Sequence, residues 1–269
     1  MTLKYVPDIK ITMELLPSEV AGWIHYFSTM DVALVRSKKY MATITAYRYK
    51  DIKNGPDSKY MHRPTGGSLS NLWVEDLGFL QTSSQTIYRR WEPMSFPEIG
   101  EVLPLTPRIE FKDDRGYFTN LYEFDGIINT DYKTASNPVV STTGYLKDAR
   151  KYPGGVAYKW RHDYRANMIE KTVTLRYHTK KPTVNIIEPI VFWEGMTFTQ
   201  TGPREAQITL KGQKLKFKIV VGNAVLTLGQ DAEKYKWPFP SLKCYPLKIE
   251  VIPGVSDIQT VAYQLIFAD

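Results

Sequence analysis

A hydrophobic residue at every second position, repeated through several segments, is the feature that most restricts what this chain can fold into. In Lys214–Ile219, three apolar residues alternate with three lysines. Side chains along a β-strand point to opposite faces in turn, so this pattern predicts a strand with one buried face and one solvated face. We expect Gln207–Leu210 to pair with it as a hairpin through a turn at Lys211–Gln213.

The same signal recurs along most of the sequence. Strands are predicted at Lys39–Tyr49, Glu170–His178, Leu247–Val251 and Thr260–Phe267, which are rich in β-branched and aromatic residues. Helical signals are scarce, and the best is a short turn at Ser18–Phe27, weakened by Gly22. The 17 Pro and 17 Gly lie mostly between the expected strands. The sequence therefore predicts an all-β fold, a large multi-stranded antiparallel sandwich.

The length of 269 residues fits one large β-sandwich domain over residues 1–269. A softer boundary is possible near residues 180–183, where long segments rich in Arg, His and Trp give way to shorter, Lys-rich ones. The pattern leaves open whether this is a domain boundary or a change of sheet.

The net charge of +7 favours acidic partners such as uronate-containing or sulfated glycans. The charge is spread, without a run of five like charges, so we expect no nucleic-acid and no membrane partner. The single Cys244 excludes a disulfide within the chain and is typical of a small buried apolar residue. The first residues lack the layout of a signal peptide. We therefore weigh a cytoplasmic protein against a piece of a longer exported one, and favour the second, with a periplasmic or secreted location.

Common catalytic and cofactor motifs are absent from the sequence. It has no phosphate-binding glycine loop, no paired cysteines or HExxH for zinc, and no nucleophile elbow. We expect no cofactor and no metal, and the catalytic residues stay unknown.

Three stretches carry the candidate carbohydrate-binding residues. His62 and Arg63 precede the Gly66-Gly67 turn, and Trp73 follows it. A His beside an Arg could bind a carboxylate sugar, although the plainer interpretation is a loop residue beside a tight turn.

The second stretch holds Arg89 and Trp91, which combine a forked cation with a stacking plane. The alternative is a strand arginine paired with Glu92. In the third stretch, alternation places Trp160, His162 and Tyr164 on one strand face. A Tyr/His pair could serve proton abstraction and return at a uronate, but an aromatic stripe at this spacing is more typical of a core.

A family resemblance enters at Tyr26–Ala46. An aromatic-x-x-Met-Asp motif (Phe27, Met30, Asp31) precedes a basic residue, Arg36, and an alternating strand. This stretch resembles the β-supersandwich domain of polysaccharide lyases of the chondroitin, hyaluronate and heparinase kind. The Thr65–Ser68 turn and Tyr235–Pro240 are similar to segments of bacterial glycan-degrading proteins.

The resemblance implies a galactose-mutarotase-like supersandwich that contacts an anionic polysaccharide, such as one that contains uronate. It also implies an α-helical catalytic domain upstream in the full-length protein, so we expect little catalysis by the isolated chain. Two alternatives stay open. One is a self-sufficient aldose-epimerase-like enzyme, with His162 facing Glu92 or Glu123. The other is a structural or protein-binding sandwich.

Overall fold

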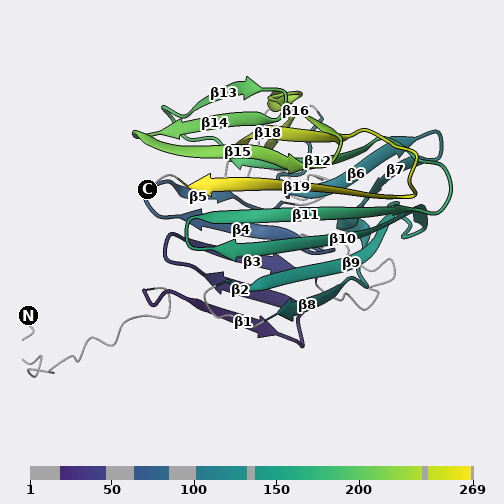
Figure 1. Ribbon diagram of the computed structural model, residues 1–269, viewed down its shortest axis with the longest axis horizontal. Helices are drawn as coiled ribbons and strands as arrows, with labels where there is room; N and C mark the ends of the chain where they lie inside the picture. The colour runs from purple at the N-terminus through teal and green to yellow at the C-terminus, as the bar shows by residue number, and fades with distance from the viewer. Residues whose placement is uncertain (1–18, 47–63, 85–100, 132–136, 238–241, 268–269) are drawn as a thin grey trace, which may run out of the picture.

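The protein, in the computed structural model, is described over residues 19–46, 64–84, 101–131, 137–237 and 242–267. These residues form two sheets, which together make two stacked layers (Figure 1). The all-β prediction of a large antiparallel sandwich is confirmed, because every paired strand is antiparallel and the helical pieces are single 3₁₀ turns.

The smaller sheet has five strands in sequence order. They are β1 (Trp23–Phe27), β2 (Val32–Arg36), β3 (Tyr40–Thr45), β4 (Ser68–Val74) and β5 (Gly78–Gln81). The predicted helical turn over Ser18–Phe27 is wrong for the part that the structure describes, since β1 occupies Trp23–Phe27. Gly22 has a φ of 87° there, and the aromatic residues after it pair with β2.

The larger sheet has fourteen strands and turns over on itself. Its first half lies in the front layer of Figure 1, in the spatial order β13 (Thr197–Gly202), β14 (Glu205–Leu210), β15 (Gln213–Val221), β19 (Ile258–Phe267), β11 (Met168–Tyr177), β10 (Pro153–Arg165), β9 (Val139–Lys147), with β8 (Ile127–Asp131) beside β9. The path continues through β7 (Gly116–Thr119), β6 (Arg108–Asp113), β12 (Val184–Val191), β18 (Leu242–Val251) and β16 (Ala224–Leu228). Strand β17 (Lys236–Trp237) pairs with β18, and the 3₁₀ turns are η2 (Asn120–Tyr122) and η3 (Ala232–Lys234).

The turnover occurs between β9 and β7, which share a single residue pair, Thr119 and Lys147. Beyond it, β12 runs beside β5 of the smaller sheet, so the smaller sheet completes the back layer. Residues 180–183 connect β11 in the front layer to β12 in the back layer.

The core lies between the layers and holds side chains from both sides of residues 180–183, including Trp160, Val173, Leu215 and Ile249. The predicted faces are confirmed on β11 and β15, where alternate residues are buried. The predicted hairpin turn is confirmed at Lys211 and Gly212, whose φ values of 50° and 80° suit a two-residue turn. Cys244 is buried, and burial raises the pKa of its thiol to about 12.

Candidate functional site

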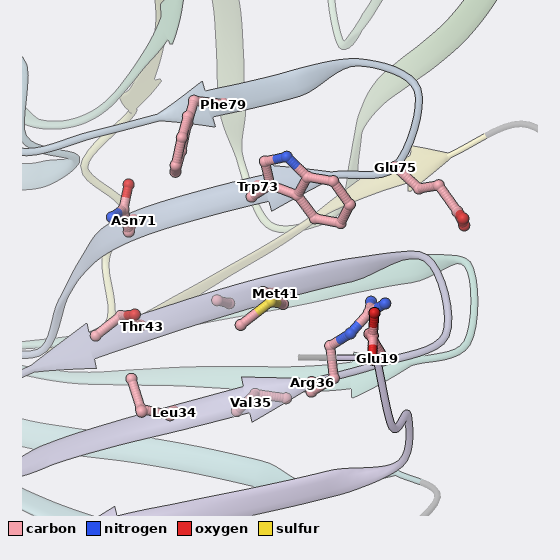
Figure 2. Close-up of a pocket in the computed structure, with 11 residues that line it drawn as sticks. Glu19, Leu34, Val35, Arg36, Met41, Thr43, Asn71, Trp73, Glu75 and Phe79 are labelled. Carbon is pink, nitrogen blue, oxygen red and sulfur yellow. The ribbon is translucent and has the colours of Figure 1, made fainter. Parts of the chain in front are cut away.

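A groove of about 740 Å³ lies on the outer surface of the five-stranded sheet (Figure 2). It lies over β2, β3, β4 and β5, on the side away from the core. Its lining mixes apolar, aromatic, amide and charged groups: Glu19, Leu34, Val35, Arg36, Met41, Ala42, Thr43, Asn71, Trp73, Glu75 and Phe79.

Strand register explains why these side chains meet. Arg36 pairs with Met41, Met41 with Trp73, and Trp73 with Phe79, so the four form one row across four strands. Each paired residue points to the same face as its partner. The intervening residues on these strands point inward, as Ala42 does, and belong to the core. The alternation that builds the sandwich therefore also builds the groove.

Arg36 is the fixed cation of the groove. Its guanidinium donates hydrogen bonds to the carbonyl oxygens of Ser37 at 2.6 Å and Tyr40 at 3.3 Å. Its central carbon lies 5.8 Å from the centre of the Trp73 ring, within cation–π range. Arg36 is only 9% exposed, and two carboxylates, from Glu19 and Glu75, also line the groove. The cation therefore orients the indole and leaves little surface for an incoming anion.

Aromatic surface continues beyond the groove. Phe79 is 47% exposed, and the Trp193 indole nitrogen donates a 2.8 Å hydrogen bond to the Phe79 carbonyl oxygen. Trp193 is itself 39% exposed. Trp73 and Phe79 are therefore neighbouring aromatic residues on β4 and β5, and Trp193, just after β12, is tied to the backbone of β5. Such rings suit ligands that have both an apolar face and hydroxyl groups.

The sequence-predicted site residues fall into three groups. Trp73 lies in the groove, half-buried. Trp160, His162 and Tyr164 lie inside the sandwich with at most 1% of their surface exposed, because alternation along β10 turns all three toward the core. These three side chains therefore offer no surface to a polysaccharide in this structure. His62, Arg63, Arg89 and Trp91 lie outside the described residues.

Phe79 lines the groove, but no motif in the sequence pointed to it. Its partnership with Trp73 depends on the β4–β5 hairpin, in which the register shifts by one residue just before this pair. Arg36 and Asp31 do belong to the motif that carries the family resemblance. Asp31 is buried between β1 and β2, has a φ of 48°, and accepts a 2.6 Å hydrogen bond from the Tyr26 hydroxyl.

Glu123, a candidate carboxylate of the epimerase alternative, is buried and already bonded. It accepts hydrogen bonds from the backbone nitrogens of Asp125 and Tyr145 at 2.9 and 2.8 Å, and an ion pair from Lys147 at 2.6 Å. With these partners, the Glu123 carboxylate stabilises the turn after η2. Glu92, the other candidate, lies outside the described residues.

His162 is fully buried, and neither ring nitrogen has a hydrogen-bond partner of good geometry in the described part of the chain. Burial, and then the positive charge of Lys171, hold the pKa of His162 well below its ordinary value, while the backbone of Val140 opposes the shift in part. In the register, Lys171 is the residue directly opposite His162 on β11. The imidazole is therefore neutral in the folded protein.

This neutral imidazole predicts a loss of stability in acid. Below pH about 6.5, the unfolded chain binds a proton at His162 that the folded protein does not bind, so the free energy of unfolding falls with pH. The contribution at pH 5 is at most about 2 kcal/mol, because each pH unit below the ordinary pKa is worth about 1.4 kcal/mol. We expect His162→Leu to flatten the pH dependence of the free energy of unfolding between pH 7.5 and 5, by up to that amount, measured by urea unfolding.

The exposed His178 provides the matched control for this pH effect. His178→Leu removes an exposed histidine, and its pH dependence of stability is the reference for His162→Leu. Equal slopes for the wild type and His162→Leu would show that His162 takes up its proton in the folded state.

The described residues contain no group of three or more His, Cys, Asp or Glu side chains arranged to hold a metal ion. They also contain no helix with the length and apolar character needed to cross a membrane.

Comparison with known proteins finds similarity to polysaccharide lyases. The family described as the ulvan lyase C-terminal domain matches residues 24–264. A broad-specificity ulvan lyase of Formosa agariphila is 30% identical over 197 residues, which are 70% of this chain and 28% of that protein. The chain thus spans little more than a quarter of the length of this curated relative.

Solved structures show the same fold at low sequence identity. Heparinase III has a TM-score of 0.64 at 7% identity, covering 93% of this chain and 37% of that protein. The heparan sulfate lyase of Pedobacter heparinus has a TM-score of 0.60 at 10% identity, covering 92% of this chain and 36% of that protein.

Proposed function

The chain belongs to the ulvan lyase C-terminal domain family, and from that premise we propose that it is the non-autonomous sandwich domain of a lyase acting on an anionic polysaccharide. The proposed contact site for the polymer is the groove. The observation that carries the proposal is the row of Trp73, Phe79, Met41 and Arg36 on an outer sheet face. In this proposal an α-helical domain elsewhere in the full-length protein supplies the elimination chemistry.

The chemistry of the groove suits the ring faces of sugars better than their charged groups. Pyranose rings present C–H groups on one face and hydroxyls at the rim, which match an indole flanked by Thr43 and Asn71. With one cation and two carboxylates in its lining, the groove has no surplus positive charge. We therefore assign to the groove the stacking part of recognition and only that part.

Stacking in the groove predicts that Trp73→Ala weakens binding of ulvan to the chain about 10-fold, equivalent to a loss of about 1.4 kcal/mol. The reason is the removal of the indole, the largest ring that lines the groove. The measurement is affinity electrophoresis of the chain in gels that contain ulvan. Melting temperatures of both proteins should be recorded, because Trp73 also contacts Arg36.

Tyr152→Ala is the matched control, because this aromatic side chain is 63% exposed and does not line the groove. It should leave ulvan binding unchanged. Equal binding by the wild type and Trp73→Ala, with both folded, would exclude the groove as a contact site. Release of unsaturated uronate by the isolated chain would contradict the non-autonomous part of the proposal.

A further inference from the structure

The outward side of the front layer carries a surplus of positive charge. On the five neighbouring strands β14, β15, β19, β11 and β10, seven cations and three carboxylates point away from the core, a surplus of four. We call this surface the front face. Its charged residues are Lys159, Arg161, Asp163, Arg165, Glu170, Arg176, Glu205, Lys214, Lys216 and Lys218.

Each carboxylate of the front face is already engaged by a neighbour. Asp163 is paired with Arg161 at 2.6 Å, and Glu205 with Lys218 at 2.6 Å. Glu170 accepts a 2.6 Å hydrogen bond from Gln264 and has Arg165 at 3.9 Å.

The remaining four cations are Lys159, Arg176, Lys214 and Lys216, and all four are exposed. Among the described residues none of them has an ion-pair partner. Because like charges on one surface repel, this surplus costs stability unless an anion accompanies it. The groove on the opposite layer has two carboxylates for one cation in its lining and carries no such surplus.

The cations are spaced as an array. Along β15, Lys214, Lys216 and Lys218 follow one another at every second residue, about 7 Å apart. Across the sheet, the register links Lys216 through Ile266 and Met168 to Arg165, a span of three strand spacings or about 14 Å. An array of separate charges on a continuous sheet suits a polymer with many anionic groups better than one small anion.

Between the cations the front face presents hydroxyl and amide groups, together with the apolar Ile266 and Met168. Thr172, Thr174, Thr260, Gln207 and Gln264 lie in the same rows as the charged residues. Such groups donate hydrogen bonds to sulfate, carboxylate and hydroxyl oxygens alike. Large aromatic rings are missing from the outward positions of these five strands, which argues against a single-stranded nucleic acid that would stack its bases.

We propose that the front face is a second, electrostatic binding surface for a sulfated or carboxylated polysaccharide, separate from the groove. The identity of the polymer as a lyase substrate rests on the proposed function, whereas the polyanion site rests on the front face alone. The polysaccharide is held through its anionic groups by Lys159, Lys214 and Lys216. Binding releases counterions from the polysaccharide. Affinity therefore falls as salt rises.

The test compares two triple variants of the chain with the same loss of charge. Lys159→Gln/Lys214→Gln/Lys216→Gln removes front-face cations, and Lys112→Gln/Lys236→Gln/Lys243→Gln removes cations from β6, β17 and β18. Binding to ulvan, dextran sulfate and uncharged dextran is measured by calorimetry at about 50 mM and about 200 mM salt. A 20-residue oligothymidylate is the nucleic-acid probe.

We expect the front-face variant to bind ulvan and dextran sulfate more weakly, by about five-fold per lysine and on the order of 100-fold in all at low salt, with a smaller salt dependence. The control triple should stay within about three-fold of the wild type. Equal weakening by both triples would overturn the proposal, as would tighter binding of the oligothymidylate than of both polysaccharides.

The experiment separates this proposal from the groove. Binding to ulvan that depends on Trp73 but not on the front lysines would overturn the front face and leave the groove intact. Binding to dextran sulfate through the front lysines, without binding to ulvan, would leave the front face intact and contradict the proposed function.

Discussion

Glu188→Gln should lower the free energy of unfolding by about 3 to 5 kcal/mol, because it leaves Lys171 charged and unpaired inside the sandwich. Both side chains are fully buried, and the Lys171 ammonium lies 2.8 Å from each carboxylate oxygen of Glu188. Burial lowers the pKa of Lys171, and Glu188 opposes that shift. The measurement is urea unfolding monitored by tryptophan fluorescence.

The pair joins the two layers, which explains the size of the expected effect. Lys171 belongs to β11 in front, Glu188 to β12 behind. Glu188 also accepts hydrogen bonds from Tyr263 of β19 at 2.5 Å and from Gln81 of β5. One carboxylate thus connects four strands from both sheets.

The double variant Lys171→Met/Glu188→Gln should recover most of the loss, since it removes the ammonium and keeps an acceptor for Tyr263. The exposed pair Lys218 and Glu205 is the control, and its double-mutant cycle should yield a coupling of only about 0.2 to 1 kcal/mol. If the two cycles gave equal coupling energies, burial would not be what makes the Lys171–Glu188 pair important.

Gly67→Ala should destabilise the protein by about 2 to 5 kcal/mol, from a strained backbone and overpacking together. Gly67 has a φ of 76°, and a Cβ placed there would lie 2.3 Å from the Thr142 side chain on β9. The Gly67 nitrogen also donates a 2.9 Å hydrogen bond to the Thr45 carbonyl oxygen, so the backbone cannot move freely. Thermal unfolding of the two proteins measures the difference.

Gly78 offers a control with the same backbone angle. Its φ is also 76°, but nothing lies within 4 Å of the Cβ position. Gly78→Ala should therefore cost only the backbone part, about 1 to 2 kcal/mol. Equal losses of stability in the two variants would mean that the Thr142 side chain moves aside without an energetic penalty.

The strands were the part of the fold that local pattern could predict. Alternation in β11, β15 and β19 identifies their buried faces, because a strand with one wet side repeats every second residue. What the pattern does not contain is which strand lies beside which. The neighbours of β19 are β15 and β11, which are far apart in the sequence, and no local signal specifies that pairing.

The candidate site was predicted least well, for a related physical reason. Trp73 could be singled out as an aromatic residue after a turn, but its partners Arg36 and Phe79 come from other strands and depend on register. The Trp160, His162 and Tyr164 stripe shows the opposite case. Period-two spacing says that the three share a face, and only the layer above them decides that this face is the interior.

The position of β19 in the middle of the front layer governs the order in which the molecule can be made. A ribosome delivers β11 and β15 well before the strand that must lie between them. Until Ile258–Phe267 has emerged, one edge each of β11 and β15 has no strand to pair with. Glu188 also lacks the hydrogen bond that Tyr263 donates to it. The facing edges of β11 and β15 are therefore closed last, by the strand that completes the front layer.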